Sequence, residues 1–169
     1  IIKKKILFEK NKKKYCRVFI TSRNRYPTRI KFALNICNVQ KDSVPSNICF
    51  NAQMPEKNFL QKKGTFKWGL IQNKSDSLVT ISNIGFLKKN KVANITIKFW
   101  KQDNEKFIEK KISIKQNASF WFQLKKNKKI KDFLANKPGW ITIQSDNPHI
   151  NGWYFEMMKN KSVGADHLF

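Results

Sequence analysis

Short segments in which apolar and polar residues alternate recur along most of the chain. In residues 93–102, for example, Ile95, Ile97 and Phe99 share one side of the segment and Trp100 lies on the other. A period of two residues is typical of a half-buried β-strand. The alternation predicts strands over residues 15–22, 29–38, 48–52, 65–71, 78–83, 93–102, 107–114, 119–124, 140–144 and 152–155.

Residues 137–155 combine turn composition with apolar alternation more clearly than any other part of the chain. Pro138 and Gly139 precede one alternating run, and the sequence SDNP at 145–148 separates it from an aromatic run that ends at Phe155. Ser, Asp, Asn and Pro are common in the loops between strands. We therefore expect these two runs to form a β-hairpin with a loop of about four or five residues.

One segment has the periodicity of a helix. Ile130, Phe133 and Leu134 are spaced at i, i+3 and i+4, with lysines around them. That spacing places the apolar side chains on one face of an α-helix, and Pro138 ends the pattern. The sequence predicts a short helix over residues 127–135.

The order of these elements predicts the fold class. About ten short strands separated by turns, with one short helix, are typical of an all-β antiparallel β-sandwich, immunoglobulin-like or jelly-roll in style. A parallel sheet would need crossover helices between its strands. We expect one domain with two related halves, made of a basic lead-in at 1–14, a first β half at 15–72, a second β half at 77–159 that contains the helix, and a tail at 160–169.

The charge of the chain is strongly positive. Its formal net charge is +24, and 31 of the 35 basic residues are lysines. A charge excess of this size attracts polyanions. However, lysine, asparagine, isoleucine and phenylalanine are encoded by codons rich in A and T, and arginine, which suits phosphate recognition, is scarce. Drift in an AT-rich genome is the favoured explanation, and a polyanion site is the alternative.

Residues with catalytic chemistry are few. Cys16, Cys37 and Cys49 lack the paired spacing of a metal site and are expected to be reduced and buried. The six glycines form no phosphate-binding or dinucleotide-binding loop. We expect no catalytic residue, and a non-enzymatic role is favoured over an enzyme.

The two histidines offer one route to a metal site. If the tail folded back onto the preceding turn, His149 and His167 would join Asp146 and Asp166 in a mixed site of the kind found in a small metal-dependent jelly-roll enzyme. No HxH or HExxH spacing supports such a site. We therefore expect solvated histidines, with neither a metal nor a cofactor.

Several large aromatic rings fall on the strand face opposite the aliphatic one. Where Ile95 and Ile97 point inward, Trp100 points outward, and the same parity holds for Trp121 and Trp140. Exposed aromatic rings on a sheet stack on sugar rings or, beside lysines, on the bases of a single strand. The candidate ligand-binding residues are Trp100, Trp121, Trp140, Trp153, Tyr154, Lys98 and Lys101. The favoured alternative is that the rings are covered by the helix, by the other half of the domain or by a partner chain.

The sequence thus predicts a non-enzymatic binding or assembly module. A glycan or surface polysaccharide is the first candidate partner, and a nucleic acid or another polyanion is the second; the oligomeric state stays open. No apolar run approaches the roughly 20 residues of a membrane span, and residues 1–8 are too few and too rich in lysine for a signal-peptide core. A cytoplasmic location is slightly favoured.

Overall fold

The part of the chain that the structure describes is an antiparallel all-β structure with one short α-helix. The computed structural model describes residues 64–72, 75–84, 91–103, 105–159 and 162–169 with their side chains, and residues 31–36 and 46–51 as backbone. Outside these described residues lie the expected lead-in at 1–14, the expected strand at 15–22 and the side chains of Cys16, Cys37 and Cys49.

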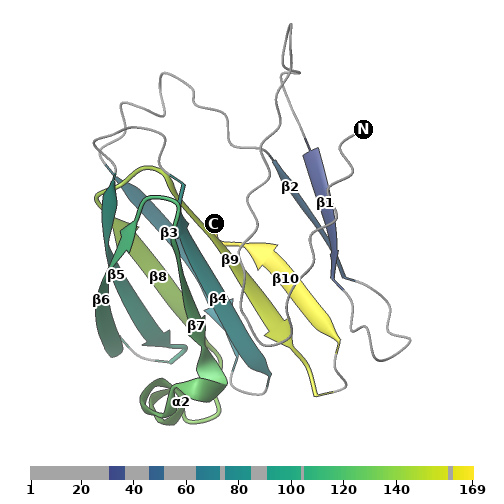
Figure 1. Cartoon of the computed structure of the whole chain (residues 1–169). Helices are drawn as coiled ribbons and strands as arrows, with labels where there is room; N and C mark the ends of the chain where they lie inside the picture. The colour runs from purple at the N-terminus through teal and green to yellow at the C-terminus, as the bar shows by residue number, and fades with distance from the viewer. Residues whose placement is uncertain are drawn as a thin grey trace, which may run out of the picture.

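Eight strands form two four-stranded sheets (Figure 1). Sheet I has the order β3 (Thr65–Ile71), β8 (Gly139–Ser145), β5 (Val92–Lys101) and β6 (Phe107–Lys115). Sheet II has the order β10 (Val163–His167), β9 (Ile150–Met157), β4 (Asp76–Asn83) and β7 (Ser119–Gln123). All neighbouring strands in both sheets are antiparallel. A separate antiparallel pair, β1 (Lys31–Ile36) and β2 (Ser46–Asn51), lies beside β10.

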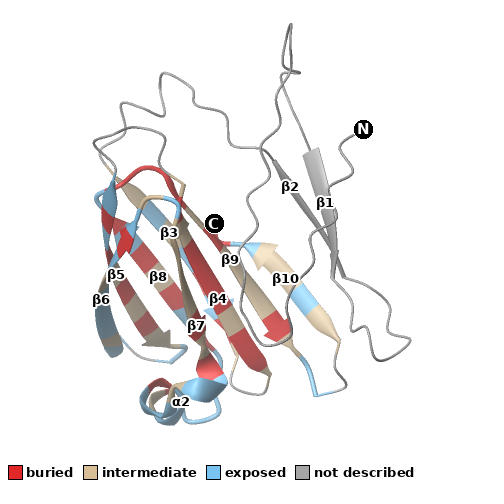
Figure 2. Cartoon of the chain, viewed as in Figure 1, coloured by how far each residue is buried: buried red, intermediate tan, exposed pale blue. Residues whose placement is uncertain are grey.

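The apolar core lies between the two sheets. Along β5 and β8 the buried residues alternate with more exposed ones, as the period of a strand requires, and Figure 2 shows this banding in both sheets. Phe99 of β5 and Phe122 of β7 come from different sheets, and their ring centroids are 4.7 Å apart. All the strands that alternation predicted between residues 65 and 124 are confirmed.

The predicted helix is confirmed as α2 (Lys128–Leu134), which follows the 3-10 turn η2 (Leu124–Lys126). Asn127 caps α2, because its side-chain oxygen accepts a hydrogen bond from the backbone N–H of Ile130 at 3.3 Å. Ile130 and Leu134 are buried in the core. The helix therefore closes one end of the space between the sheets, on the path from β7 to β8 (Figure 1).

The expected hairpin at residues 137–155 is wrong. β8 and β9 are consecutive, but β8 pairs with β3 and β5 in sheet I, whereas β9 pairs with β4 and β10 in sheet II. The loop between them is anchored through Asn147, whose amide donates to the side-chain oxygen of Asn83 at 3.3 Å and accepts from the backbone N–H of His149 at 2.8 Å. Turn composition specifies a change of direction, and the strand partners depend on the tertiary structure. The loop carries the chain from one sheet to the other.

Alternation in the sequence gave no sign of β10. Its pairing with β9 runs from Val163 opposite Met157 to His167 opposite Trp153. Gly164 is the second residue of β10, and glycine is depleted in strands. The strand therefore forms because the edge of β9 offers backbone pairing partners, and not because residues 163–167 have a high intrinsic preference for strand.

A buried carboxyl group lies where the connection from β3 to β4 meets β9. Glu156 is 6% exposed, and its carboxylate accepts hydrogen bonds from the Ser77 hydroxyl at 2.5 Å and from the Ser75 hydroxyl. Burial raises the pKa of Glu156 above its usual value of 4.5; the two serine hydroxyls oppose this rise, and the nearby charge of Asp76 adds to it. The folded protein therefore binds this proton more tightly than the unfolded chain does.

We expect Glu156 to make the free energy of unfolding fall as the pH rises from 4.5 towards neutrality. Its contribution is complete below the unfolded-state pKa and is lost as the pH passes the raised folded-state pKa, because the folded protein must then hold a buried anion. Urea unfolding across this range should show a smaller fall for Glu156→Gln. The matched control Glu109→Gln, at an exposed glutamate of β6, should keep the wild-type slope. An unchanged slope in Glu156→Gln contradicts the prediction.

Candidate functional site

A continuous row of large apolar side chains crosses the outer face of sheet I. Leu70 is opposite Trp140 in the strand register, Trp140 is opposite Trp100, and Trp100 is opposite Phe107. Facing residues of antiparallel strands project to the same side of the sheet, so the four side chains form one line across β3, β8, β5 and β6. Leu70 is 45% exposed, Trp140 and Phe107 are each 43% exposed, and Trp100 is half-buried. These four residues are called the aromatic row below.

Direct contacts hold the middle of the aromatic row in place. The ring centroids of Trp100 and Phe107 are 4.7 Å apart. The indole N–H of Trp100 donates a hydrogen bond to the Thr142 hydroxyl at 2.9 Å. This bond is made at the edge of the indole ring and orients it. An aromatic ring held in this way loses little conformational freedom when a ligand binds.

The two lysines expected near a ligand lie in different places. The Nζ atom of Lys98 is 4.4 Å from the ring centroid of Phe107 and 5.8 Å from that of Trp100, which is the range of a cation–π contact. Lys98 therefore puts a positive charge beside the aromatic row. Lys101 instead contacts the helix, where its Nζ atom is 5.0 Å from the ring centroid of Phe133.

The other expected aromatic residues are in sheet II. Trp121 and Trp153 are both half-buried and both opposite Thr80 in the register, so they share the outer face of that sheet. Tyr154, the next residue along β9, has the opposite parity and packs against the core. Its partial burial raises its pKa above 10.0. The structure thus brings together Trp100, Trp140 and Lys98, and separates them from the rest.

Sequence reasoning missed the contribution of β3 to this surface. Phe66, Trp68 and Leu70 share a face by alternation, and the structure exposes all three, Phe66 by 63% and Trp68 by 44%. Gly69 is buried on the opposite face, next to Leu168. Alternation divides a strand into two faces but does not say which one meets the core. Alternation therefore grouped these three side chains on one face, but it did not show that this face points to solvent.

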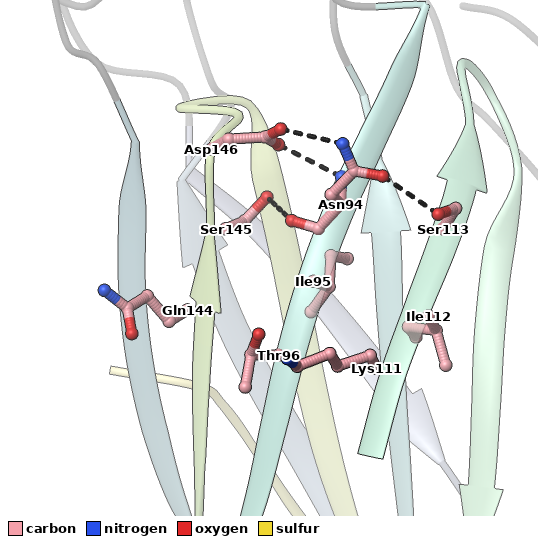
Figure 3. Close-up of a pocket in the computed structure, with 9 residues that line it drawn as sticks. All are labelled: Asn94, Ile95, Thr96, Lys111, Ile112, Ser113, Gln144, Ser145 and Asp146. Carbon is pink, nitrogen blue, oxygen red and sulfur yellow. Dashed lines mark hydrogen bonds between the residues drawn. The ribbon is translucent and has the colours of Figure 1, made fainter. Parts of the chain in front are cut away.

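A polar hollow lies on the same outer face of sheet I, towards the loop between β8 and β9. It is open, has a volume of about 630 Å³ and is lined by residues of β5, β6 and β8 (Figure 3). Asp146 accepts two hydrogen bonds from Asn94, from its backbone N–H and from its side-chain amide, both at 3.0 Å. The hydroxyl of Ser113 donates to the other side of the Asn94 amide at 2.9 Å. This network fixes a carboxylate, an amide and a hydroxyl at the rim of the hollow.

The structure does not support the mixed histidine and carboxylate metal site. Among the described residues, no group of three or more His, Cys, Asp or Glu side chains could hold a metal ion. The expectation that His149 is solvated is wrong, because its side chain is fully buried within the anchored loop between β8 and β9. His167 is exposed on β10, and its Nδ1 atom is 2.8 Å from a carboxylate oxygen of Asp166. Within the described ranges, no helix has the length and apolar character needed to cross a membrane.

Comparisons with known proteins give little further information. No protein-family model matches the chain, and no match is found among curated proteins. One similar solved structure is the crystal structure of Thermotoga maritima 1070, at 22% identity and a TM-score of 0.48, over 62% of this chain and 91% of that one.

Proposed function

We propose that the chain is a non-enzymatic binding module whose aromatic row recognises a glycan. The observation behind this proposal is the continuity of the row, which occupies facing positions on all four strands of sheet I and includes three side chains that are 43% to 45% exposed. Contiguous exposed apolar surface is uncommon on soluble proteins and marks interaction sites. The site would act by binding, without any covalent step.

The chemistry of the row suits a sugar ring. The C–H groups on the face of a sugar ring are apolar, whereas its hydroxyl groups project from the edge. A flat aromatic side chain such as Trp140 removes that face from water and leaves the hydroxyls free for hydrogen bonds. Lys98, beside Phe107 and Trp100, places an ammonium group at the edge of the row, and Glu109 lies opposite it in the strand register.

We also infer that the two sheets make a β-sandwich. The contact between Phe99 and Phe122 across one shared core supports this architecture. The pairs β4–β7 and β5–β8 match the inner pairs of an immunoglobulin domain, but β3 pairs with β8 and β9 with β4, unlike the edge strands of that fold. A sandwich of this kind presents a broad outer face, which suits an elongated ligand.

The lysines around α2 support a second candidate, a charge-driven polyanion site. Asp132 is the only acidic residue in η2 and α2. The exposed lysines of this region are Lys125, Lys126, Lys128, Lys129 and Lys131. Such a cluster would bind nucleic acid through released counterions, and its affinity would fall steeply with salt concentration.

A binding panel distinguishes these two functions. Purified protein would be tested against neutral glycans, acidic glycans and single-stranded nucleic acid, each at near-physiological and at raised salt. Glycan binding that survives raised salt is the expected result, because stacking on aromatic rings depends little on ionic strength. If the protein binds acidic glycans and nucleic acid but no neutral glycan, and if this binding is lost at raised salt, the lysine cluster is favoured and the glycan proposal is overturned.

A further inference from the structure

We propose that the polar hollow is a second subsite for the same ligand and that the ligand is an uncharged, hydroxyl-rich oligosaccharide. This inference rests on the proposed function, because it extends the binding site from the aromatic row along the strands of sheet I. One sugar unit would lie in the hollow and donate hydroxyl hydrogen bonds to Asp146, while other units stack on the row.

The Asp146 carboxylate is oriented by its neighbours and has the capacity to accept such hydrogen bonds. Each of its oxygens accepts one bond from Asn94, and a carboxylate oxygen can accept about two. One acceptor position therefore remains on each oxygen, on an exposed residue at the rim of the hollow. Two neighbouring acceptors fit a pair of adjacent sugar hydroxyls, and hydrogen bonds to a charged acceptor are stronger than neutral ones.

The charges of this face favour an uncharged ligand over an acidic one. The Nζ atom of Lys111 is 3.5 Å from the carboxylate of Glu109, and Glu109 is also opposite Lys98 in the strand register. Both lysines thus have an acidic neighbour. The hollow itself is lined by one lysine, Lys111, and one carboxylate, Asp146, and Asp146 would repel a carboxylate or sulfate group.

The positions of the two subsites set the length of the ligand. Trp100 of the aromatic row and Thr96 of the hollow are on β5 and point to the same side. They are four residues apart, which is about 13 Å at the rise of a strand. Asn94, which also lines the hollow and bonds to Asp146 (Figure 3), is two residues farther from Trp100 along β5 than Thr96 is. A single sugar cannot contact both subsites, whereas an extended oligosaccharide can.

The test measures affinity for ladders of neutral cello-, xylo- and galacto-oligosaccharides, with oligogalacturonate as the acidic comparison. We expect wild-type affinity for a neutral ladder to rise with chain length and to exceed that for the acidic one. Asp146→Asn should lower affinity for the longest neutral member about tenfold. Thr96→Val removes a hydroxyl from the hollow with little change of shape, and a loss of several-fold is expected. The matched control Asp132→Asn makes the same charge change on α2 and should bind like wild type.

The outcomes separate this inference from the proposed function. Neutral-oligosaccharide binding that is lost in Trp140→Ala but unchanged in both Asp146→Asn and Thr96→Val overturns the second subsite and leaves the aromatic row in place. A preference for oligogalacturonate overturns the uncharged ligand. Absence of binding to every member of the ladders overturns both proposals. Thermal unfolding of each variant shows whether a lost affinity comes from a lost fold; if Asp146→Asn does not fold, Thr96→Val decides the inference alone.

Discussion

Leu168→Ala is expected to lower the free energy of unfolding by roughly 2–5 kcal/mol, the usual cost of truncating a buried leucine. Leu168 is fully buried although it follows the last strand. Its side chain lies over Gly69 of β3 and Gly152 of β9, so closely that a methyl group on Gly69 would be 2.5 Å from a Leu168 methyl carbon. These glycines belong to different sheets. Leu168 therefore fills the space between the sheets on the side of β3 and β9.

Backbone hydrogen bonds hold Leu168 and its neighbour in place. The N–H of Leu168 donates to the carbonyl of Gly152 at 2.9 Å. Phe169 exchanges two hydrogen bonds with Trp68, at 2.9 and 3.0 Å, and thereby pairs with the edge of β3. The truncation would thus leave a cavity whose walls are fixed by the backbone and cannot easily collapse.

Urea unfolding of Leu168→Ala and Leu70→Ala provides the measurement. The two variants remove the same atoms, but Leu70 is 45% exposed, so its truncation should cost less than about 1 kcal/mol. Equal free energies of unfolding for the two variants would show that Leu168 does not join the sheets. A large loss in Leu168→Ala alone would confirm that the residues after β10 belong to the core.

Trp140→Ala should weaken glycan binding by about fivefold to 150-fold, because a stacked ring contributes roughly 1–3 kcal/mol. Trp140 lies in the middle of the aromatic row, between Leu70 and Trp100. Removing it would divide the row into two separate apolar patches. Since the side chain is 43% exposed, the domain should still fold, and titration with the glycan identified in the panel gives the change in affinity.

Trp121→Ala is the matched control for this prediction. It deletes the same side chain from a half-buried position on the outer face of sheet II, away from the aromatic row. We expect glycan affinity to remain at the wild-type value. If Trp121→Ala weakens binding while Trp140→Ala does not, the ligand site lies on sheet II. If Trp140→Ala abolishes folding, its ring supports the structure, and Phe107→Ala at the far end of the row then tests the site.

Some residues of the candidate site were predictable from the sequence, but the full set of residues that form it was not. Strand parity correctly placed Trp100 and Trp140 on one side of their strands and the isoleucines of β5 and β8 on the other. The same parity grouped Trp121 with them, although β7 belongs to the other sheet. Parity describes one strand at a time, and it has no information about which sheet the strand joins. Which residues lie together on one surface therefore depends on how the strands pair.

The local structure of this protein follows from its residue pattern. A period of two residues defined β3 to β7, because alternate side chains of a strand must meet opposite environments, and the spacing of Ile130, Phe133 and Leu134 defined α2. Packing between distant segments places β8 and β9 in different sheets, forms β10 at the edge of β9, and turns Phe66 and Trp68 outward. These features depend on contacts between residues far apart in the chain, such as Leu168 with Gly69, and such contacts leave no periodic pattern in the sequence.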